Sequence, residues 1–254
     1  MARHSHWHQI RLKKGVADKK RGKIFTKHAR LIETAAQIGG GGDPDENPTL
    51  RMAIDNAKAD NVPNENIERA IKKGTGELKD EEIMYEVVYE GYAPGGVALV
   101  IETLTENKNR TSQHIRTAFM KGGGNMGAEG STKFLFDRKA QLRVVLREGS
   151  ERDVDELEII DAGADDIQDG ADGELIVYGA PEELGKIRDD LIAKGFNVKA
   201  AELVFIPKNT VEVTDVESAQ KILALIDVID ELDDVLNVAS ALELSDEVAE
   251  RFSK

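Results

Sequence analysis

Three histidines at alternating positions lie near the start of the sequence, where His4, His6 and His8 surround the chain's single tryptophan, Trp7. In an extended segment alternate side chains project to the same side, so the three imidazoles could together chelate a transition metal. Removal of Met1 would also leave an imidazole at the third position from a free amine, a geometry that can bind Cu(II) or Ni(II). No carboxylate or second segment can be assigned to complete or orient either site. We therefore predict no metal site and no cofactor.

The same segment carries a run of cations, and this combination favours contact with a polyanion. Imidazoles donate hydrogen bonds to phosphate, and an indole can stack on a base. The residues predicted to make these contacts are His4, Trp7, Arg11, Lys13 and Lys14. A tail anchored by its tryptophan is the structural alternative. Because no nucleophile or carboxylate can be paired with the histidines, we predict that the protein is not an enzyme.

Charge is divided unevenly along the chain, although the net charge of -14 by itself argues against a nucleic-acid partner. Residues 1–76 contain 15 Lys and Arg against 9 Asp and Glu, whereas the remainder contains 19 against 39. The first 30 residues contain 10 basic residues and 1 acidic residue. This polarity predicts one end that attracts polyanions and a remainder that repels them.

A cationic amphipathic helix is predicted over residues 17–38, because apolar residues recur on one side at 3.6-residue spacing while cations occupy the other. The predicted nucleic-acid-binding residues here are Lys19, Lys20, Arg21, Lys23, Lys27 and Arg30. A second helix is expected to begin with Asn47 as its cap and Pro48 at its first position. A third follows Pro63 and ends at Gly74, with further predicted binding residues on its outer side: Arg69, Lys72 and Lys73.

Beyond residue 80 the pattern changes to that of an α/β protein. Residues 84–105 indicate two strands joined by a tight turn, followed by a helix over residues 111–121 and a strand over residues 133–136. Residues 139–203 then predict strand, helix, strand, strand, helix and strand, which is the βαββαβ order of a ferredoxin-like unit. A helix over residues 216–231 and a strand over residues 235–239 come last, and we expect them to complete the first sheet.

Two short motifs at predicted turns contain residues that could bind phosphate. Gly122, Gly124 and Gly127 match G-x-G-x-x-G, but the run follows a helix and leads into a strand, whereas pyrophosphate binding needs a strand followed by a helix. We therefore interpret it as a tight turn with positive φ angles. At the second turn, Arg110 and nearby backbone N–H groups could face a phosphate, or Asn109 or Thr111 could simply cap the following helix.

The fold class predicted from these patterns is α+β with three domains: an N-terminal helical domain plus two ferredoxin-like α/β domains, one inserted in the other. The predicted boundaries are 1–80 for the basic helical domain, 81–138 and 204–254 for the discontinuous α/β domain, and 139–203 for the inserted domain. The chain has no cysteine, which excludes disulfides and thiolate metal sites and suits a cytoplasmic protein. No apolar run approaches the roughly 18 residues of a membrane span, so no membrane partner is expected.

Several of these segments together resemble the YebC family, which includes a mitochondrial translational activator of cytochrome c oxidase. They are HSHW from His4, KRGKIFTK from Lys20, the long stretch from Gly40 to Glu77, YEGYAPGGVA from Tyr89, TENKNRT from Thr105 and GGNMGAEGS from Gly123. The resemblance runs over nearly the whole chain. It implies a helical domain followed by two α/β domains, and a non-enzymatic, cytoplasmic role in gene expression.

Two functions are consistent with the sequence. The first is a DNA-binding transcriptional regulator whose basic helical domain holds the phosphate backbone. The second is a ribosome-associated translation factor, in which the same cations meet ribosomal RNA and the acidic domains meet ribosomal proteins or tRNA. The protein partners expected from the two functions are the ribosome and proteins of transcription or translation. A protein scaffold and an enzyme rank below both. Since a lysine binds either phosphate backbone in the same way, the sequence does not separate the first two.

Overall fold

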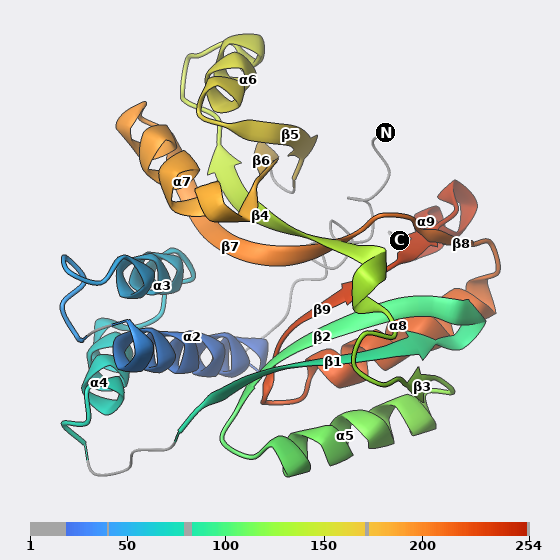
Figure 1. Ribbon diagram of the computed structural model, residues 1–254. Helices are drawn as coiled ribbons and strands as arrows, with labels where there is room; N and C mark the ends of the chain where they lie inside the picture. The colour runs from blue at the N-terminus through green and yellow to red at the C-terminus, as the bar shows by residue number, and fades with distance from the viewer. Residues whose placement is uncertain (1–18, 40, 79–82, 171–172, 253–254) are drawn as a thin grey trace. The chain divides into compact units, whose positions relative to one another are not determined.

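The computed structural model describes residues 19–39, 41–78, 83–170 and 173–252 and shows an α+β protein (Figure 1). The chain forms two compact units, each built from segments that are distant in the sequence. The first unit contains residues 84–138 and 204–252, and the second contains the described residues between 19 and 83 together with residues 139–203. The predicted three-domain boundaries remain a proposal.

The first unit is built on a four-stranded antiparallel sheet in the order β3-β1-β2-β9. The strands are β1 (Tyr85–Ala93), β2 (Val97–Thr105), β3 (Asn125–Met126) and β9 (Val235–Ser240). A tight turn joins β1 to β2, and both of its glycines, Gly95 and Gly96, have a φ of 78°, which an L side chain rarely adopts. Because β9 pairs with β2, the late strand completes the first sheet, as predicted.

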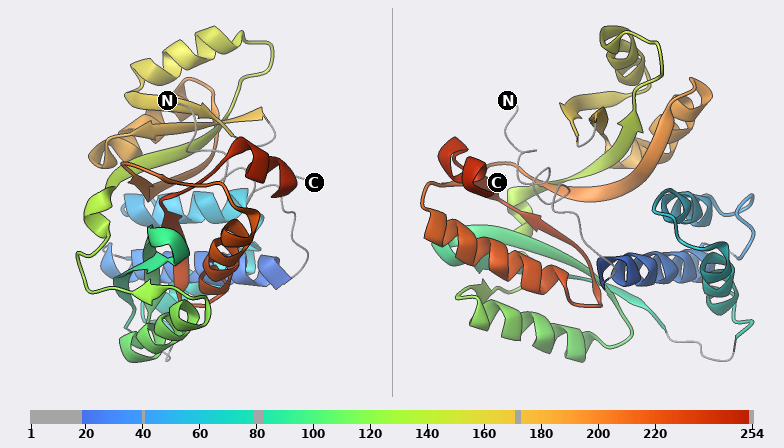
Figure 2. Two further views of the ribbon diagram at one scale, coloured as in Figure 1. Left: turned by 90° about the vertical axis from the view of Figure 1, so that its right-hand side faces the viewer. Right: turned by 180° about the vertical axis from the view of Figure 1, so that it is seen from behind.

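Alternation along β2 places apolar side chains on both faces of this sheet. Val97, Leu99 and Ile101 point into the larger core, which α5 (Lys108–Lys121) and α8 (Val216–Asp230) cover. Figure 2 shows both helices on the same face of the sheet. Ala98 and Val100 point the other way, into a smaller cluster with aromatic side chains from residues 136 and 205. The unit is completed by a parallel pair, β8 (Val211–Val213) and β10 (Leu242–Leu244), and by α9 (Asp246–Phe252).

The second unit contains the predicted βαββαβ element order. Its sheet has the order β5-β6-β4-β7, with antiparallel pairing of β6 to both β4 and β5. The elements are β4 (Phe136–Val145), α6 (Arg152–Asp161), β5 (Ala164–Asp169), β6 (Glu174–Gly179), α7 (Leu184–Ala193) and β7 (Asn197–Pro207). The apolar sides of α6 and α7 pack with alternate residues of β4 and β6 around one core. This strand order is that of a ferredoxin-like sheet.

Three helices form the other part of the second unit: α2 (Lys19–Ile38), α3 (Pro48–Ala59) and α4 (Asn64–Gly74). Their shared core includes Ile32, Leu50 and Ile67. The predicted start of α3 is confirmed, because Asn47 Oδ1 accepts a hydrogen bond from Leu50 N at 3.0 Å and Pro48 is the first helical residue. Asn47 Nδ2 also donates to the carbonyl oxygen of Ala35 at 2.9 Å, so this cap ties α3 to the end of α2.

Helix α3 packs along β7, which is an edge strand of its sheet. Asn56 Nδ2 donates to the carbonyl oxygen of Ala201 at 2.8 Å, and Asn56 Oδ1 accepts from Ala201 N at 3.0 Å. The carboxylate of Asp55 pairs with Arg188 of α7. The amide side chain thus takes the place of a neighbouring strand, satisfying and covering backbone groups that an edge strand would otherwise expose.

The structure corrects two predicted boundaries. Helix α5 begins at Lys108 and not at residue 111, and its cap is Asn107, whose Oδ1 accepts from Arg110 N at 3.1 Å, and not Asn109 or Thr111. The strand predicted over residues 133–136 is a 3₁₀ turn at Lys133–Leu135 that leads into β4. The sequence analysis also missed β3, β8 and β10, since strands of two or three residues carry no periodic signal, and the seven-residue helix α9.

We predict that replacing Asn56 with alanine destabilises the second unit. The change removes both hydrogen bonds to Ala201 and leaves two backbone groups without their partner, which costs about 1–3 kcal/mol. Urea unfolding of the full chain measures the effect. Asn66→Ala, at an exposed position of α4, is the control and should change the midpoint little. An unchanged Asn56→Ala midpoint would contradict this account of how α3 is held.

Candidate nucleic-acid interface

The cations of α2 lie on the side of the helix opposite its core. Lys23, Lys27 and Arg30 follow i, i+4, i+7 spacing, whereas Ile32 and Ala36 are buried against the other helices. The three side chains are half-buried. The expected cationic face is therefore present on α2 but is less open to solvent than its composition suggests. Lys19, Lys20 and Arg21 belong to the same helix, and their side chains lie outside the described part of the structure.

Helix α4 carries the more open cations of the second unit. Arg69 and Lys72 are exposed, and neither forms an ion pair with another described residue. Lys73 differs from them, because its Nζ lies 3.1 Å from Oε1 of the buried Glu33 of α2. Of the three predicted binding residues on α4, two are available for an external anion and one ties α4 to α2.

A carboxylate at the end of α3 modifies the charge near α2. Asp60 Oδ2 lies 2.7 Å from Nε2 of the buried His28, and its other oxygen lies 3.7 Å from Arg143 of β4. Burial raises the pKa of this carboxylate, but the hydrogen bond with His28 and the positive charges of Arg143 and Lys27 together lower it below its ordinary value. Asp60 is thus ionised near neutral pH and offsets part of the charge of Lys27.

Arginines of the inserted segment are committed to the protein's own carboxylates. The ion pairs are Arg143 with Glu174, Arg147 with Asp155 and Glu158, Arg152 with Glu156 and Asp169, and Arg188 with Asp55 and Asp189. The most buried acid among them is Asp155, which is 0% exposed and accepts hydrogen bonds from Arg147 and Ser150. These guanidinium groups neutralise internal acids, so they add little to any external binding of anions.

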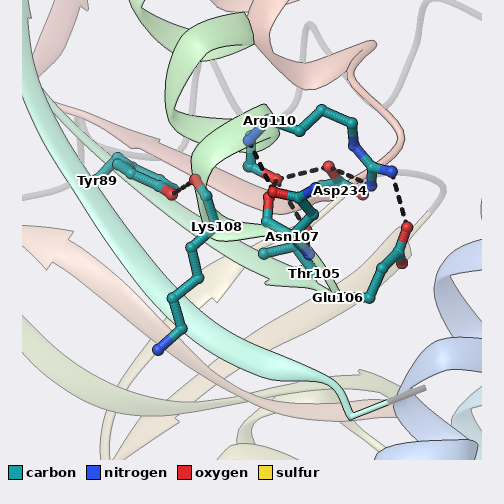
Figure 3. A network of polar contacts seen from close by, with 8 residues as sticks. Tyr89, Thr105, Glu106, Asn107, Lys108, Arg110 and Asp234 are labelled. Atoms are coloured by element: carbon teal, nitrogen blue, oxygen red, sulfur yellow. Dashed lines mark hydrogen bonds and ion pairs between the residues drawn. The ribbon is translucent and has the colours of Figure 1, made fainter. Parts of the chain in front are cut away.

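The predicted binding residue Arg110 is likewise engaged inside the first unit (Figure 3). Its guanidinium donates to Glu106 at 2.8 Å and to both oxygens of Asp234, at 3.1 and 3.2 Å. These hydrogen bonds raise the pKa of Arg110. Asp234 is buried and belongs to the loop before β9, so Arg110 joins the start of α5 to a segment 124 residues later. This pairing favours the structural interpretation of Arg110 over phosphate binding.

The rest of this turn is also satisfied internally. Thr111 Oγ1 donates to Asp234 at 2.7 Å and lies 2.8 Å from Thr105 Oγ1, and both threonines are buried. Tyr89 O–H donates to the carbonyl oxygen of Lys108 at 3.0 Å, as Figure 3 also shows. The turn and the start of α5 therefore form a closed polar network that fixes β9 against β2.

The glycine-rich segment donates its backbone N–H groups to a carboxylate of the protein itself. Glu90 of β1 is 2% exposed, and its oxygens accept from the N–H groups of Gly130, Thr132 and Lys133 at 2.7, 2.6 and 2.7 Å. Converging N–H groups of this kind make a nest that suits an anion. Here the nest holds an internal anion. The predicted positive φ angles occur at Gly123 (73°) and Gly130 (81°), but not at the motif glycines Gly122, Gly124 and Gly127.

The remaining predicted residues lie outside the described part of the chain: His4, Trp7, Arg11, Lys13 and Lys14. Within the described ranges, no group of three or more His, Cys, Asp or Glu is placed to hold a metal ion. No helix in those ranges combines the length and apolar character needed to cross a membrane.

Sequence reasoning missed the acidic partners that decide which cations are available. Asp155 and Asp234 lie among other charged residues in the sequence and Glu90 lies between tyrosine and glycine, so no local pattern marks any of the three as buried. The single local signal was the pairing of an arginine with acids four residues away, as between Arg110 and Glu106.

The fold and these contacts define a class of protein: an α+β protein with a cationic helical segment joined to acidic α/β segments. A family model described as the TACO1/YebC protein N-terminal domain matches residues 5–77, and one described as the TACO1/YebC second and third domain matches residues 84–242. The chain belongs to the TACO1/YebC family.

Curated relatives match over their full length. Proteins from Aquifex aeolicus and Persephonella marina are 45% and 46% identical to this chain over 99–100% of both sequences, and each is named a probable transcriptional regulatory protein. A crystal structure of a conserved hypothetical protein from Aquifex aeolicus has a TM-score of 0.86 and 45% identity, covering 96% of this chain and 99% of that one.

We predict that Arg110→Gln lowers the stability of the first unit. The buried Asp234 would lose two hydrogen bonds from a charged donor, a cost of about 1–3 kcal/mol. Arg116→Gln, at an exposed position of the same helix, is the matched control and should stay within about 0.5 kcal/mol of wild type in urea unfolding. If Arg110→Gln weakened polyanion binding and left unfolding unchanged, the structural interpretation would be wrong.

A second prediction concerns the pH dependence of stability. Burial raises the pKa of Glu90, but the hydrogen bonds from Thr132, Lys133 and Gly130 lower it by more, to below its ordinary value of 4.5. A carboxylate whose pKa is lower in the folded state stabilises the protein above its unfolded pKa and loses this effect as the pH falls through its folded pKa.

Glu90→Gln should therefore cost about 1–3 kcal/mol at pH 7, and the difference from wild type should shrink below about pH 4.5. Denaturant unfolding across pH 7 to 3.5 measures this difference. Glu86→Gln, exposed on the same strand, is the control. A difference that does not change with pH would show that the ionised form of Glu90 is not what holds the turn.

Proposed function

We propose that this protein is a non-enzymatic, cytoplasmic regulator of gene expression, and that it acts as a DNA-binding transcriptional regulator through the cations of its N-terminal helical domain. The residues that we assign to binding are His4, Trp7 and the predicted cations that lie before residue 77. Among those whose side chains the structure describes, Arg69 and Lys72 are exposed. The names of the curated relatives support a regulatory role in general.

The observation that carries this proposal is the separation of available positive charge from the rest of the chain. Basic residues outnumber acidic ones in residues 1–76, whereas most of the later arginines are paired with internal carboxylates. A polyanion is therefore attracted to one part of the chain and repelled by the remainder. The acidic segments would limit non-specific wrapping of the nucleic acid.

Binding through α4 would be to phosphates and not to base edges. A recognition helix places its N-terminal residues in the major groove. The first turn of α4 instead contains Asn64, Glu65 and Asn66, and its cations come at the other end of the helix. The carboxylate of Glu65 at this end disfavours entry of the helix into a groove lined by phosphates. We therefore expect nucleic-acid binding through α4 to depend only weakly on the base sequence.

The lack of a base-reading end on α4 also favours the second candidate, a ribosome-associated translation factor. Structured ribosomal RNA is recognised largely by shape and by its phosphates, which needs no such helix. The acidic segments would then face ribosomal or other translation proteins.

We predict that Arg69→Gln combined with Lys72→Gln weakens polyanion binding and leaves stability unchanged, since both side chains are exposed. If each contacts a phosphate of duplex DNA, the slope of log affinity against log salt should become less negative by roughly 1–2. Lys186→Gln with Lys221→Gln removes the same charge from two exposed lysines that are already paired with glutamates, and it should have little effect. Equal effects of the two pairs would contradict a localised interface.

Ribosome co-sedimentation and duplex-DNA retention at physiological salt separate the two candidates. Retention by ribosomes alone would remove the transcriptional proposal, and retention by DNA alone would remove the translational one. Retention by neither would contradict nucleic-acid binding altogether.

A further inference from the structure

The outer face of α6 exposes three large apolar side chains. Val154, Leu157 and Ile160 are 45%, 63% and 53% exposed and recur at three-residue spacing along the helix. No other described helix carries three large apolar residues with this exposure. Contiguous exposed apolar surface of this kind marks an interaction site in soluble proteins.

The opposite side of the helix fixes which residues face outward. Ile159 is 0% exposed in the core, and the carboxylate of Asp155, also 0% exposed, accepts two hydrogen bonds from the guanidinium of Arg147, at 2.9 and 2.6 Å. Turning α6 to bury Leu157 would break this buried charged pair and remove Ile159 from the core. Because breaking a buried pair is strongly destabilising, the apolar face is held toward solvent.

Carboxylates surround this apolar face. Asp153 and Asp161 are exposed on the same outer side of α6, and Glu151 precedes the helix. The edge strand β5 lies next to α6 (Figure 1) and carries the exposed Asp166, together with Asp165, which is paired with Lys139. Arg152 is the one basic residue of α6, and it is paired with Glu156 and Asp169. The surface is therefore apolar at its centre and negative around it.

We propose that the outer face of α6 binds a cationic amphipathic helix of a partner protein. Leucine-like side chains of such a helix would cover Val154, Leu157 and Ile160, and lysines or arginines beside them would meet Asp153 and Asp161. Nucleic acids and anionic membranes are repelled by the same carboxylates, and a second copy of this face would bring like charges together. The proposal goes beyond nucleic-acid binding and does not rest on it.

The test uses the full chain and an 18-residue peptide of leucine and lysine with leucine at i, i+3, i+4 and i+7 spacing. A scrambled peptide of the same composition controls for charge alone. We expect the amphipathic peptide to bind at least about 10-fold more tightly than the scrambled one, with amide shift changes concentrated in residues 151–161.

Leu157→Gln with Ile160→Gln should weaken binding by about 10-fold, because the buried apolar contacts are lost. Met120→Gln with Val228→Gln changes two exposed apolar helical residues of the first unit and should change binding less than about 2-fold. Asp153→Asn with Asp161→Asn should reduce the affinity for the peptide at low salt and should make this affinity depend less on salt. The control, Glu182→Gln with Asp190→Asn, changes two other exposed acids and should alter neither quantity.

Four outcomes would overturn the proposal. The first is that both peptides bind equally well, and the second is that the variant with Leu157→Gln and Ile160→Gln binds the peptide as wild type does. The third is that the wild-type protein is a dimer and this variant is a monomer. The fourth is that this variant no longer binds duplex DNA. The third would assign the face to a second copy of the chain and the fourth to nucleic acid. Circular dichroism of each variant checks that the fold is kept.

Discussion

Buried carboxylates impose the main constraint on this protein, because each must find donors inside the fold. Asp155 is satisfied by Arg147 and Ser150, Asp234 by Arg110 and Thr111, and Glu90 by backbone N–H groups of the glycine-rich turn. The contacts of Asp234 and Glu90 hold together segments that are 124 and 40 residues apart in the sequence. The contacts of the two aspartates occupy Arg147 and Arg110, and ion pairs engage most other arginines of the acidic segments, so the cations that we propose for an external partner are those before the first sheet.

This internal pairing also determines what the surfaces offer. Where Arg147 anchors α6, three apolar side chains are held toward solvent among carboxylates. Where α3 joins the edge of β7, the amide of Asn56 and the pair of Asp55 with Arg188 attach the cationic helices to the acidic inserted segment. The second unit thus carries both of the surfaces that we propose, one for phosphates and one for a basic helix.

Local patterns predicted much of the fold. The amphipathic period of α2, the Asn47–Pro48 helix start and the βαββαβ order of residues 139–203 are properties of neighbouring residues, and the structure contains all three. The candidate site was harder to predict from the sequence, because ion pairs between distant segments decide which cations are free. Arg110 and Arg69 look alike in the sequence, yet only Arg110 meets a buried aspartate 124 residues away. The start of α5 was misplaced because Asn109 and Thr111 also have side chains that can cap a helix, whereas the structure uses Asn107.

Lysine footprinting of the full chain can show whether nucleic acid contacts only the N-terminal cations. Acetylation of each lysine is measured by mass spectrometry with and without duplex DNA or ribosomal RNA. We expect protection to be confined to lysines of residues 1–76, including Lys72, and we expect Lys186, Lys199 and Lys221 to react at the same rate in both conditions. Protection of these last three lysines, with none before residue 76, would contradict binding through the N-terminal cations.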